Sequence, residues 1–317
     1  MYALDAARGL AILAMIIYHF SWDLSWFGFV SWQVAAEFGW RVFAGLIAGS
    51  FLFLSGAGIY LAHHEKIRWR GFWRRELVIV AAAAGVSLVT YLAFGETFVR
   101  FGILHAIAVS SLIALAFIRA PASLTALAAL VFATAPLWAS SAVFDGPFWV
   151  WTGLGHPGYG SVDYVPVAPW TGVTLAGLCA ANLAQCAGLP GRLRLWAPSG
   201  RFAATFRFLG QHSLPIYLIH QPILFSLVWA IAALGLAPDR AASAFQESCT
   251  VSCLAVQGEA ANCAAACACT LDGLKQDGLW EPLTGNPMDP DLRQHMNSRY
   301  AQCLANPALF GPEESGK

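Results

Sequence analysis

The chain has 317 residues, of which 58% are hydrophobic and 11% carry a charge, and its mean hydropathy is +0.58. Soluble domains are typically about 45–50% apolar and about 25% charged, so this composition excludes an ordinary soluble protein and indicates an integral membrane protein. The formal net charge is zero. It gives no reason to expect a nucleic-acid partner, and the lipid bilayer is the expected one.

Long uncharged runs follow one another along the chain, close to the roughly 20 residues that a helix needs to cross a bilayer. We predict seven spans, at about residues 6–21, 42–62, 77–94, 101–118, 123–140, 166–188 and 213–235. The Trp-rich stretch Phe148–Leu154 has Gly and Pro neighbours, which are typical of a re-entrant or surface segment. The predicted fold is an all-α membrane bundle over residues 1–238, followed by a small Cys-rich tail, also helical, over residues 239–317.

The basic residues predict how this bundle is oriented. With seven spans, three groups of Lys and Arg fall on one side: Lys66, Arg68, Arg70, Arg74 and Arg75; Arg119; and Arg192, Arg194, Arg201 and Arg207. Cytoplasmic loops are enriched in these residues, so we expect the N-terminus inside a bacterial inner membrane and the tail in the periplasm. The first helix has no signal-peptide cleavage pattern and is expected to be retained. We interpret Arg68–Arg75 as charge that faces lipid.

Charged residues form one stripe along the first span. Arg8 and His19 are eleven residues apart in RGLAILAMIIYH. At about 100° per residue, eleven steps bring a helical side chain back to nearly the same face, roughly 16 Å further along the axis. Asp5 lies three residues before Arg8, and Asp23 lies four after His19, so both continue the stripe. Ionisable groups in a membrane helix usually face the bundle interior and have a function there.

His19, Asp23 and Arg8 each have a functional and a structural interpretation. Asp23 could orient the His19 imidazole and raise its basicity, as a general base requires, or His19 could be an inert histidine at the membrane interface. Arg8 could bind a phosphate or a carboxylate through its guanidinium fork, or it could anchor the inner end of the span. Because Arg8 and His19 share one stripe, we favour a functional role for His19.

Other polar residues could line the same site. His105 opens the fourth span, His220 lies within the seventh, and Asp163 stands at the outer mouth of the sixth. Nearby prolines also allow a structural role for His220, and Asp163 could be a turn residue. The second span carries small residues that favour close helix packing: Gly45, Gly49, Gly56 and Gly58.

Six of the eight cysteines lie in the tail: Cys249, Cys253, Cys263, Cys267, Cys269 and Cys303. An even number of cysteines in a small segment outside the cytoplasm predicts disulfides. Two pairs have a four-residue spacing and would face each other across a helical hairpin that turns near Gly258–Asn262. This predicts the bonds Cys249–Cys267 and Cys253–Cys263 and leaves Cys269 for Cys303. Four thiolates could instead bind zinc.

The chain resembles bacterial members of the heparan-alpha-glucosaminide N-acetyltransferase-like family, within the transmembrane acyltransferase superfamily. The resemblance covers about residues 3–235 and rests on five motifs in this order: LDAARGLAILAMIIYHF, FLFLSGAGIYL, FGILHAIAVS, DYVPVAPWTG and SLPIYLIHQPI. Arg8 and His19 also match the Arg and His of the related acyltransferase family 3. In the lysosomal branch the histidine held responsible for acetyl transfer precedes a Ser-Trp pair. No histidine stands immediately before Ser31–Trp32 here, so that role falls to His19.

The resemblance implies an enzyme that transfers an acyl group, commonly acetyl from acetyl-CoA, to a sugar. We therefore expect a membrane acyltransferase that uses acyl-CoA as co-substrate and an envelope saccharide or glycolipid as acceptor. Arg8 would hold the phosphate-bearing part of the donor, and His19 would take the acceptor's proton or carry the acyl group itself. No metal or permanently bound cofactor is required.

Two other functions are compatible with the sequence. In a transporter or flippase the same buried charges would form a substrate or proton path, although no inverted repeat is evident between the halves of the chain. In a membrane anchor the important part would be the Cys-rich tail, which would bind a partner outside the cell. Release of CoA by the purified protein would separate the acyltransferase from both.

Overall fold

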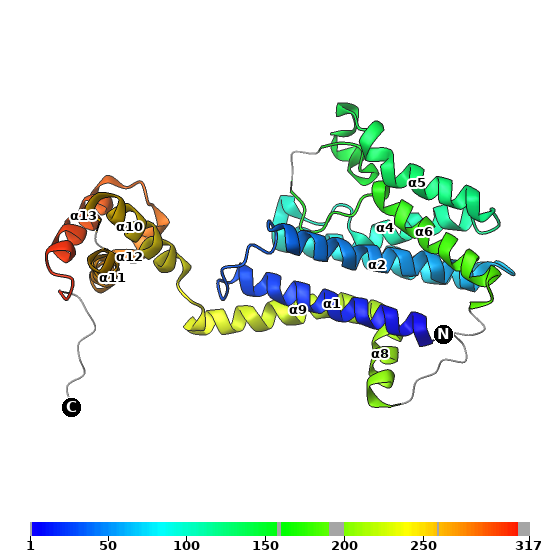
Figure 1. Ribbon diagram of the computed structural model, residues 1–317, viewed down its shortest axis with the longest axis horizontal. Coiled ribbons are helices and arrows are strands. Elements are labelled where there is room, and N and C mark those ends of the chain that lie inside the picture. The colour runs from blue at the N-terminus through cyan, green and yellow to red at the C-terminus, as the bar shows by residue number, and fades with distance from the viewer. Residues whose placement is uncertain (1, 157–159, 190–199, 259, 310–317) are drawn as a thin grey trace. The chain divides into compact units, whose positions relative to one another are not determined.

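The computed structural model describes residues 2–156, 160–189, 200–258 and 260–309 (Figure 1). The chain divides into two units, Met1–Ala230 and Ile231–Lys317. The sequence places the boundary at residue 238, where the composition changes. In the structure the division falls a few residues earlier, near the end of the last apolar helix.

Among the described residues, seven apolar helices make up most of the first unit: α1 (Tyr2–Trp26), α2 (Phe38–His63), α3 (Trp69–Phe94), α4 (Ile103–Ala116), α5 (Ala122–Trp138), α6 (Val167–Cys186) and α9 (Ser213–Ile231). Five are long and apolar enough to cross a membrane: α1, α2, α3 with its extension to Thr97, α6, and α9 with its extension to Leu236. The chain is therefore a membrane protein of the all-α class, and each predicted span corresponds to one of these helices.

Helices α4 and α5 are shorter than predicted, with 14 and 17 residues. Their lengths are about 21 Å and about 26 Å, against a hydrocarbon core of about 30 Å. Helix α4 begins late because long-range contacts hold the residues before it. Phe101 accepts a 3.0 Å hydrogen bond from Val165 N, and the Ile103 N–H donates to Asp163 Oδ2 at 3.0 Å. The apolar pattern cannot reveal this start, because Asp163 lies 60 residues away.

The remaining elements of the first unit are short. They are η1 (Gly95–Thr97), η2 (Ala142–Phe144), η3 (Pro147–Thr152) and α8 (Arg201–Gln211). The Trp-rich stretch predicted to be a re-entrant or surface segment forms the 3₁₀ helix η3 and does not cross the unit. It is held in place by Tyr164 Oη, which donates to Val150 O at 2.9 Å.

The helices of the first unit define two ends. Helix α1 begins where α2 ends (Figure 1), and the start of α3 reaches this end because Arg75 binds Ser55 of α2. We call it the arginine end, because Arg8 and Arg75 lie there. Helix α1 finishes at the opposite end, where α4 and α6 begin and where α9 also ends (Figure 1).

Glycines bring two pairs of helices into backbone contact. A Cβ atom on Gly56 of α2 would collide with the Thr174 carbonyl of α6, and one on Gly177 of α6 would collide with the Phe53 carbonyl of α2. Helices α1 and α8 meet in the same way, since a Cβ on Gly210 would collide with the Asp5 carbonyl. Of the small residues of α2 that the sequence singles out, Gly56 thus serves close packing, as predicted.

The described part of the second unit begins with η4 (Ala232–Leu236), which extends α9, and contains four α-helices: α10 (Arg240–Gln257), α11 (Ala260–Gln276), α12 (Trp280–Gly285) and α13 (Pro290–Ala305). Two disulfides join α10 to α11 and one joins α11 to α13, with Cα–Cα distances of 5.9, 5.6 and 5.7 Å: Cys249–Cys267, Cys253–Cys263 and Cys269–Cys303. These are the pairs that the cysteine spacing predicts. All six thiols are used in them, so the structure favours disulfides over the alternative zinc site.

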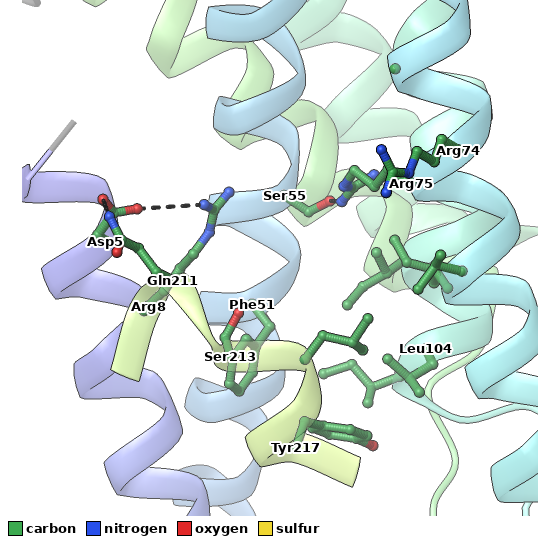
Figure 2. A pocket seen from close by; sticks show the side chains of 17 residues that line it. Asp5, Arg8, Phe51, Ser55, Arg74, Arg75, Leu104, Gln211, Ser213 and Tyr217 are labelled. Carbon is green, nitrogen blue, oxygen red and sulfur yellow. Dashed lines mark hydrogen bonds and ion pairs between the residues drawn. The ribbon is translucent and has the colours of Figure 1, made fainter. Parts of the chain in front are cut away.

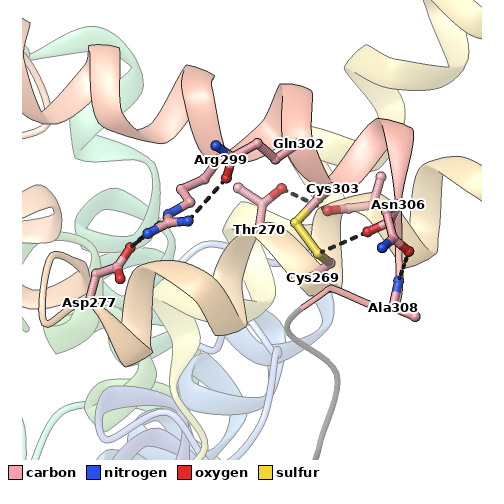
Figure 3. The surroundings of a disulfide bond; sticks show 9 residues. Cys269, Thr270, Asp277, Arg299, Gln302, Cys303, Asn306 and Ala308 are labelled. Carbon is pink, nitrogen blue, oxygen red and sulfur yellow. Dashed lines mark hydrogen bonds and ion pairs between the residues drawn. A yellow bond between two sulfur atoms is a disulfide. The ribbon is translucent and has the colours of Figure 1, made fainter.

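Polar contacts complete this unit. Asp239 caps α10 by accepting from Ala242 N at 3.0 Å, and its other oxygen accepts from Trp280 Nε1 at 2.9 Å and lies 3.0 Å from Lys275 Nζ. Near the third disulfide, Arg299 Nε donates to Asp277 Oδ2 at 2.7 Å and so joins α13 to the end of α11 (Figure 3). Beneath these contacts lies a small apolar core of α10, α11 and α12 side chains.

Replacing Gly56 by Ala should lower the thermal stability of the full chain in detergent. The added methyl group must push α2 away from the Thr174 carbonyl, and overpacking of this kind costs about 1–3 kcal/mol. Gly45→Ala is the matched control on the same helix, because its new Cβ would lie 4.0 Å from Trp170, an ordinary contact distance. Equal unfolding midpoints for the two variants would contradict the proposed packing.

Removing the third disulfide should destabilise the tail more than removing the second. Cys269 and Cys303 are 34 residues apart, whereas Cys253 and Cys263 are 10 apart. The loop-entropy model therefore gives the Cys269→Ser, Cys303→Ser variant an additional loss of about 1 kcal/mol. Urea-dependent proteolysis of the tail within the full chain measures both variants, and the reverse order would count against the model.

Candidate functional site

Two predicted site residues from the first and the last apolar helix meet in the structure. The His19 ring of α1 and the His220 ring of α9 have centroids 5.0 Å apart. His220 is buried, and its Nδ1 lies 2.8 Å from the Tyr217 carbonyl oxygen. A carbonyl oxygen can only accept a hydrogen bond, so Nδ1 carries a proton, and in the neutral imidazole Nε2 then carries a lone pair. Nε2 has no hydrogen-bond partner among the described residues.

Asp23 lies one turn beyond His19 and is fully buried. Gln221 Nε2 donates to Asp23 Oδ1 at 2.8 Å. The sequence suggests that Asp23 orients His19, but no hydrogen bond between these two appears within the described part of the chain. The second oxygen of Asp23 and the Gln221 carbonyl oxygen are buried without a partner there. Two hydrogen-bond acceptors thus stand unused close to the histidine pair, and burying them in this state costs about 1–3 kcal/mol each.

Gln221 was not among the predicted site residues. Its position directly after His220 in SLPIYLIHQPI was the available signal. The partner on α1 is 198 residues away in sequence, so no local pattern shows the contact.

Asp163 and His105 both lie at the start of α4. Asp163 accepts from the Ile103 N–H, and a Cβ atom on Gly102 would collide with its carboxylate, so glycine makes room for this cap. Burial raises the pKa of the Asp163 carboxyl above its usual range, although the Ile103 hydrogen bond opposes the shift. Asp163 also interacts electrostatically with Tyr217. It therefore caps α4 and lies near enough to influence Tyr217, the residue next to the histidine pair, through its charge.

His105 is placed by local contacts. Its Nδ1 accepts from the Gly102 N–H at 3.3 Å, and its Nε2 lies 3.4 Å from Ser87 Oγ on α3. Both ring nitrogens therefore have partners within α3 and the start of α4. The structure does not bring His105 into ring contact with His19 or His220 among the described residues.

A cavity of about 630 Å³ lies between α1, α2, α3, α4, α8 and α9. Its polar part is lined by Asp5, Arg8, Ser55, Arg74, Arg75 and Gln211, and its apolar part by Phe51, Ile103, Leu104, Ile107, Leu214 and Tyr217. Figure 2 shows Arg74 and Arg75 on one side of this space and Tyr217 on the other. The cavity therefore has a cationic part at the arginine end and an apolar part deeper in the unit.

The sequence suggested that Arg75 is a charge that faces lipid. In the structure Arg75 instead contacts side chains of two other helices. Its guanidinium turns inward and donates to Ser55 Oγ of α2 at 3.1 Å and to Ser111 Oγ of α4 at 3.3 Å. Glu76 Oε2 lies 3.8 Å from the same guanidinium. Two buried serines on other helices supply these acceptors, and the sequence of the basic segment carries no sign of them.

Arg8 extends from α1 into the cavity, where its guanidinium lies next to α2. Its Nη1 lies 4.0 Å from Asp5 Oδ1, and Gln211 Nε2 donates to the other oxygen of Asp5 at 3.5 Å. A Cβ on Gly58 would lie 2.8 Å from Arg8 Nη2, so the missing side chain leaves room for the guanidinium. Arg8 and Arg75 interact electrostatically and repel each other. Three arginines around one cavity are suited to an anionic ligand, above all one with phosphate groups.

Tyr217 connects the cavity with the histidine pair. Its side chain lines the cavity, while its carbonyl binds His220 Nδ1. The Tyr217 and His220 rings have centroids 5.9 Å apart. A ligand with its anionic part at the arginine end and its other end at Tyr217 would thus approach two imidazoles, one of which has an unused lone pair.

One comparison with known proteins gives a match. The family model described as "Heparan-alpha-glucosaminide N-acetyltransferase, catalytic" matches residues 1–222. No curated protein and no solved structure matches the chain. The matched range contains the cavity, the histidine pair, Asp23 and Gln221, and it ends before the Cys-rich tail.

Proposed function

Because the chain belongs to the family of the heparan-alpha-glucosaminide N-acetyltransferase catalytic domain, we propose that it is a membrane acyltransferase that takes an acyl group, commonly acetyl, from acyl-CoA. The acceptor is a hydroxyl or an amine of an envelope saccharide or glycolipid. One observation carries this proposal. A single cavity has three arginines at one end and, at the other, a tyrosine whose ring contacts His220, which in turn contacts His19.

The shape and polarity of the cavity suit a CoA thioester. Such a donor has phosphate groups at one end and a long, nearly neutral arm that ends in the thioester. Arg8, Arg74 and Arg75 would bind the phosphates, since guanidinium groups form paired, charge-assisted hydrogen bonds with them. The arm would follow the apolar wall formed by residues such as Phe51 and Leu104. The thioester would then lie near Tyr217.

The histidine pair would manage the proton of the reaction. The oxygen or nitrogen of the acceptor forms a bond to the thioester carbonyl carbon, and the carbon–sulfur bond breaks. The proton of the acceptor passes to an imidazole of the pair, and the CoA sulfur leaves as a thiolate that is protonated in turn. His220 Nε2 has the lone pair that this step requires. In a two-step version His19 would first take the acyl group and then pass it on.

We further propose that the arginine end faces the cytoplasm, where acyl-CoA is made, and that the tail is periplasmic. Helix α1 begins at the arginine end and α9 ends at the opposite end of the first unit, which agrees with this orientation (Figure 1). The three disulfides support it independently, because disulfides persist in oxidising compartments. The protein would then be a multi-pass protein of the bacterial inner membrane.

Replacing His19 or His220 by Ala should lower CoA release by about 10²- to 10⁴-fold, the usual effect of losing a general base. The double variant should be little worse than the poorer single variant, because the two rings act as a unit. The assay uses the purified full chain in detergent, with acetyl-CoA and glucosamine as the probe acceptor. His212→Ala is the matched control, because His212 is exposed outside the pair. Wild-type turnover by His19→Ala would refute the catalytic role of that residue.

Replacing Arg8 or Arg75 by Lys should weaken donor binding more than turnover. Lysine keeps the charge but loses the planar fork, so the apparent KM for acetyl-CoA should rise, by about tenfold, with kcat less affected. Arg70→Lys is the control, since Arg70 is exposed on the same helix as Arg75 and does not line the cavity. An equal effect of all three variants would show that general surface charge, rather than the cavity, attracts the donor.

A further inference from the structure

Tyr217 separates the cavity from the histidine pair. Its side chain forms part of the cavity wall, on the side away from Arg74 and Arg75 (Figure 2). Behind it lie the His220 ring, at 5.9 Å between centroids, and beyond that the His19 ring, 5.0 Å from His220. A group that extends from the arginines toward the histidines therefore meets the phenol ring first.

Tyr217 is half-buried and packs against three apolar clusters. One comes from α1 and α2, the second from α3 and α4, and the third from α2, α4 and the residues around the start of α6. The nearest helices thus enclose Tyr217 on several sides. If the ring moved aside for a larger ligand, it would lose contacts with these clusters, whose buried members include Ile12, Leu104 and Ile103.

We propose that Tyr217 sets the length of the acyl group that the protein accepts and restricts it to short chains. This inference rests on the proposed function, because it requires the donor to bind with its phosphates at the arginines. With the phosphates fixed there, the depth of the apolar part decides how much chain fits beyond the thioester. Each extra methylene that a well-packed pocket must accommodate changes the specificity by about 10- to 200-fold. Tyr217 is thus a specificity-determining residue for the donor.

The side chain of Tyr217 can be tested apart from its backbone. The carbonyl that fixes the His220 tautomer belongs to the main chain, so it is retained in every Tyr217 variant. A smaller side chain should therefore change which acyl group fits while the lone pair on His220 Nε2 is kept. Tyr217→Phe retains the ring and should retain the specificity.

The experiment compares acetyl-CoA with hexanoyl-CoA as donors for the purified full chain, with glucosamine as the acceptor. The wild-type protein and Tyr217→Phe should prefer acetyl-CoA in kcat/KM. Tyr217→Ala and the less disruptive Tyr217→Leu should raise the ratio of hexanoyl to acetyl kcat/KM at least about tenfold. Ile219→Ala is the matched control two residues further along α9, where the side chain is 55% exposed, and should leave the ratio unchanged.

A binding measurement on the unaltered chain covers the case in which both smaller variants fail to fold. The non-reactive thioethers ethyl-CoA and hexyl-CoA should differ in dissociation constant at least about tenfold, with ethyl-CoA the tighter. Equal binding of the two, equal use of both thioesters by the wild-type protein, or an unchanged ratio in a folded Tyr217→Leu variant would overturn the inference and leave the proposed function standing. Failure of the wild-type protein to release CoA from either thioester would overturn the proposed function itself, and the inference with it.

Discussion

Burial of charged and polar side chains inside an apolar bundle is the constraint on which the rest of this structure depends. Each such group must find a partner within the protein, because surrounding lipid offers none. Asp23 binds Gln221, and His220 binds the Tyr217 carbonyl. Arg75, whose side chain is 41% exposed, still reaches two buried serines. Six buried polar atoms in the described part of the chain have no hydrogen-bond partner. Three of them belong to Asp23, His220 and Gln221, and the other three belong to Glu76 and Thr174. Unmet hydrogen-bonding capacity at one place is what a binding site for a polar acceptor requires.

Close packing puts these groups where they can act together. Gly56 and Gly177 let α2 and α6 approach backbone to backbone, and Gly210 does the same for α8 and α1. Gly58 then leaves the space above α2 that the Arg8 guanidinium fills. The glycines of one helix thus have two different physical roles. One role is contact between helices, and the other is room for a charged side chain at the edge of a cavity. The sequence alone assigns both Gly56 and Gly58 to helix packing, because the spacing of the glycines does not show whether a backbone or a charged side chain lies opposite each of them.

Structural features that depend on local geometry were predicted well from the spacing of residues in the sequence. The apolar runs gave the seven helices, and the four-residue spacing of the cysteines gave the pairs Cys249–Cys267 and Cys253–Cys263. The sequence could not predict features that depend on distant partners. The start of α4 is set by Asp163, the inward turn of Arg75 is set by serines on α2 and α4, and Gln221 finds Asp23 across the bundle. Both histidines of the pair were singled out from the sequence, but their contact became visible only in the structure.

The position of Tyr217 bears on how a reaction of the proposed kind could connect two sides of a membrane. A CoA donor carries several negative charges, and moving such charges through hydrocarbon is far more costly than moving a small neutral group. In this bundle the arginines at one end of the cavity would bind those charges, and beyond the tyrosine lie two imidazoles and the unused oxygens of Asp23 and Gln221. If the donor binds on the arginine side of the tyrosine and the acceptor binds on the side of the imidazoles, the acyl group crosses only as its bond to the CoA sulfur breaks and a bond to His19 or to the acceptor forms. The protein then needs no path for the whole donor or for the saccharide, and a narrow passage beside Tyr217 is sufficient.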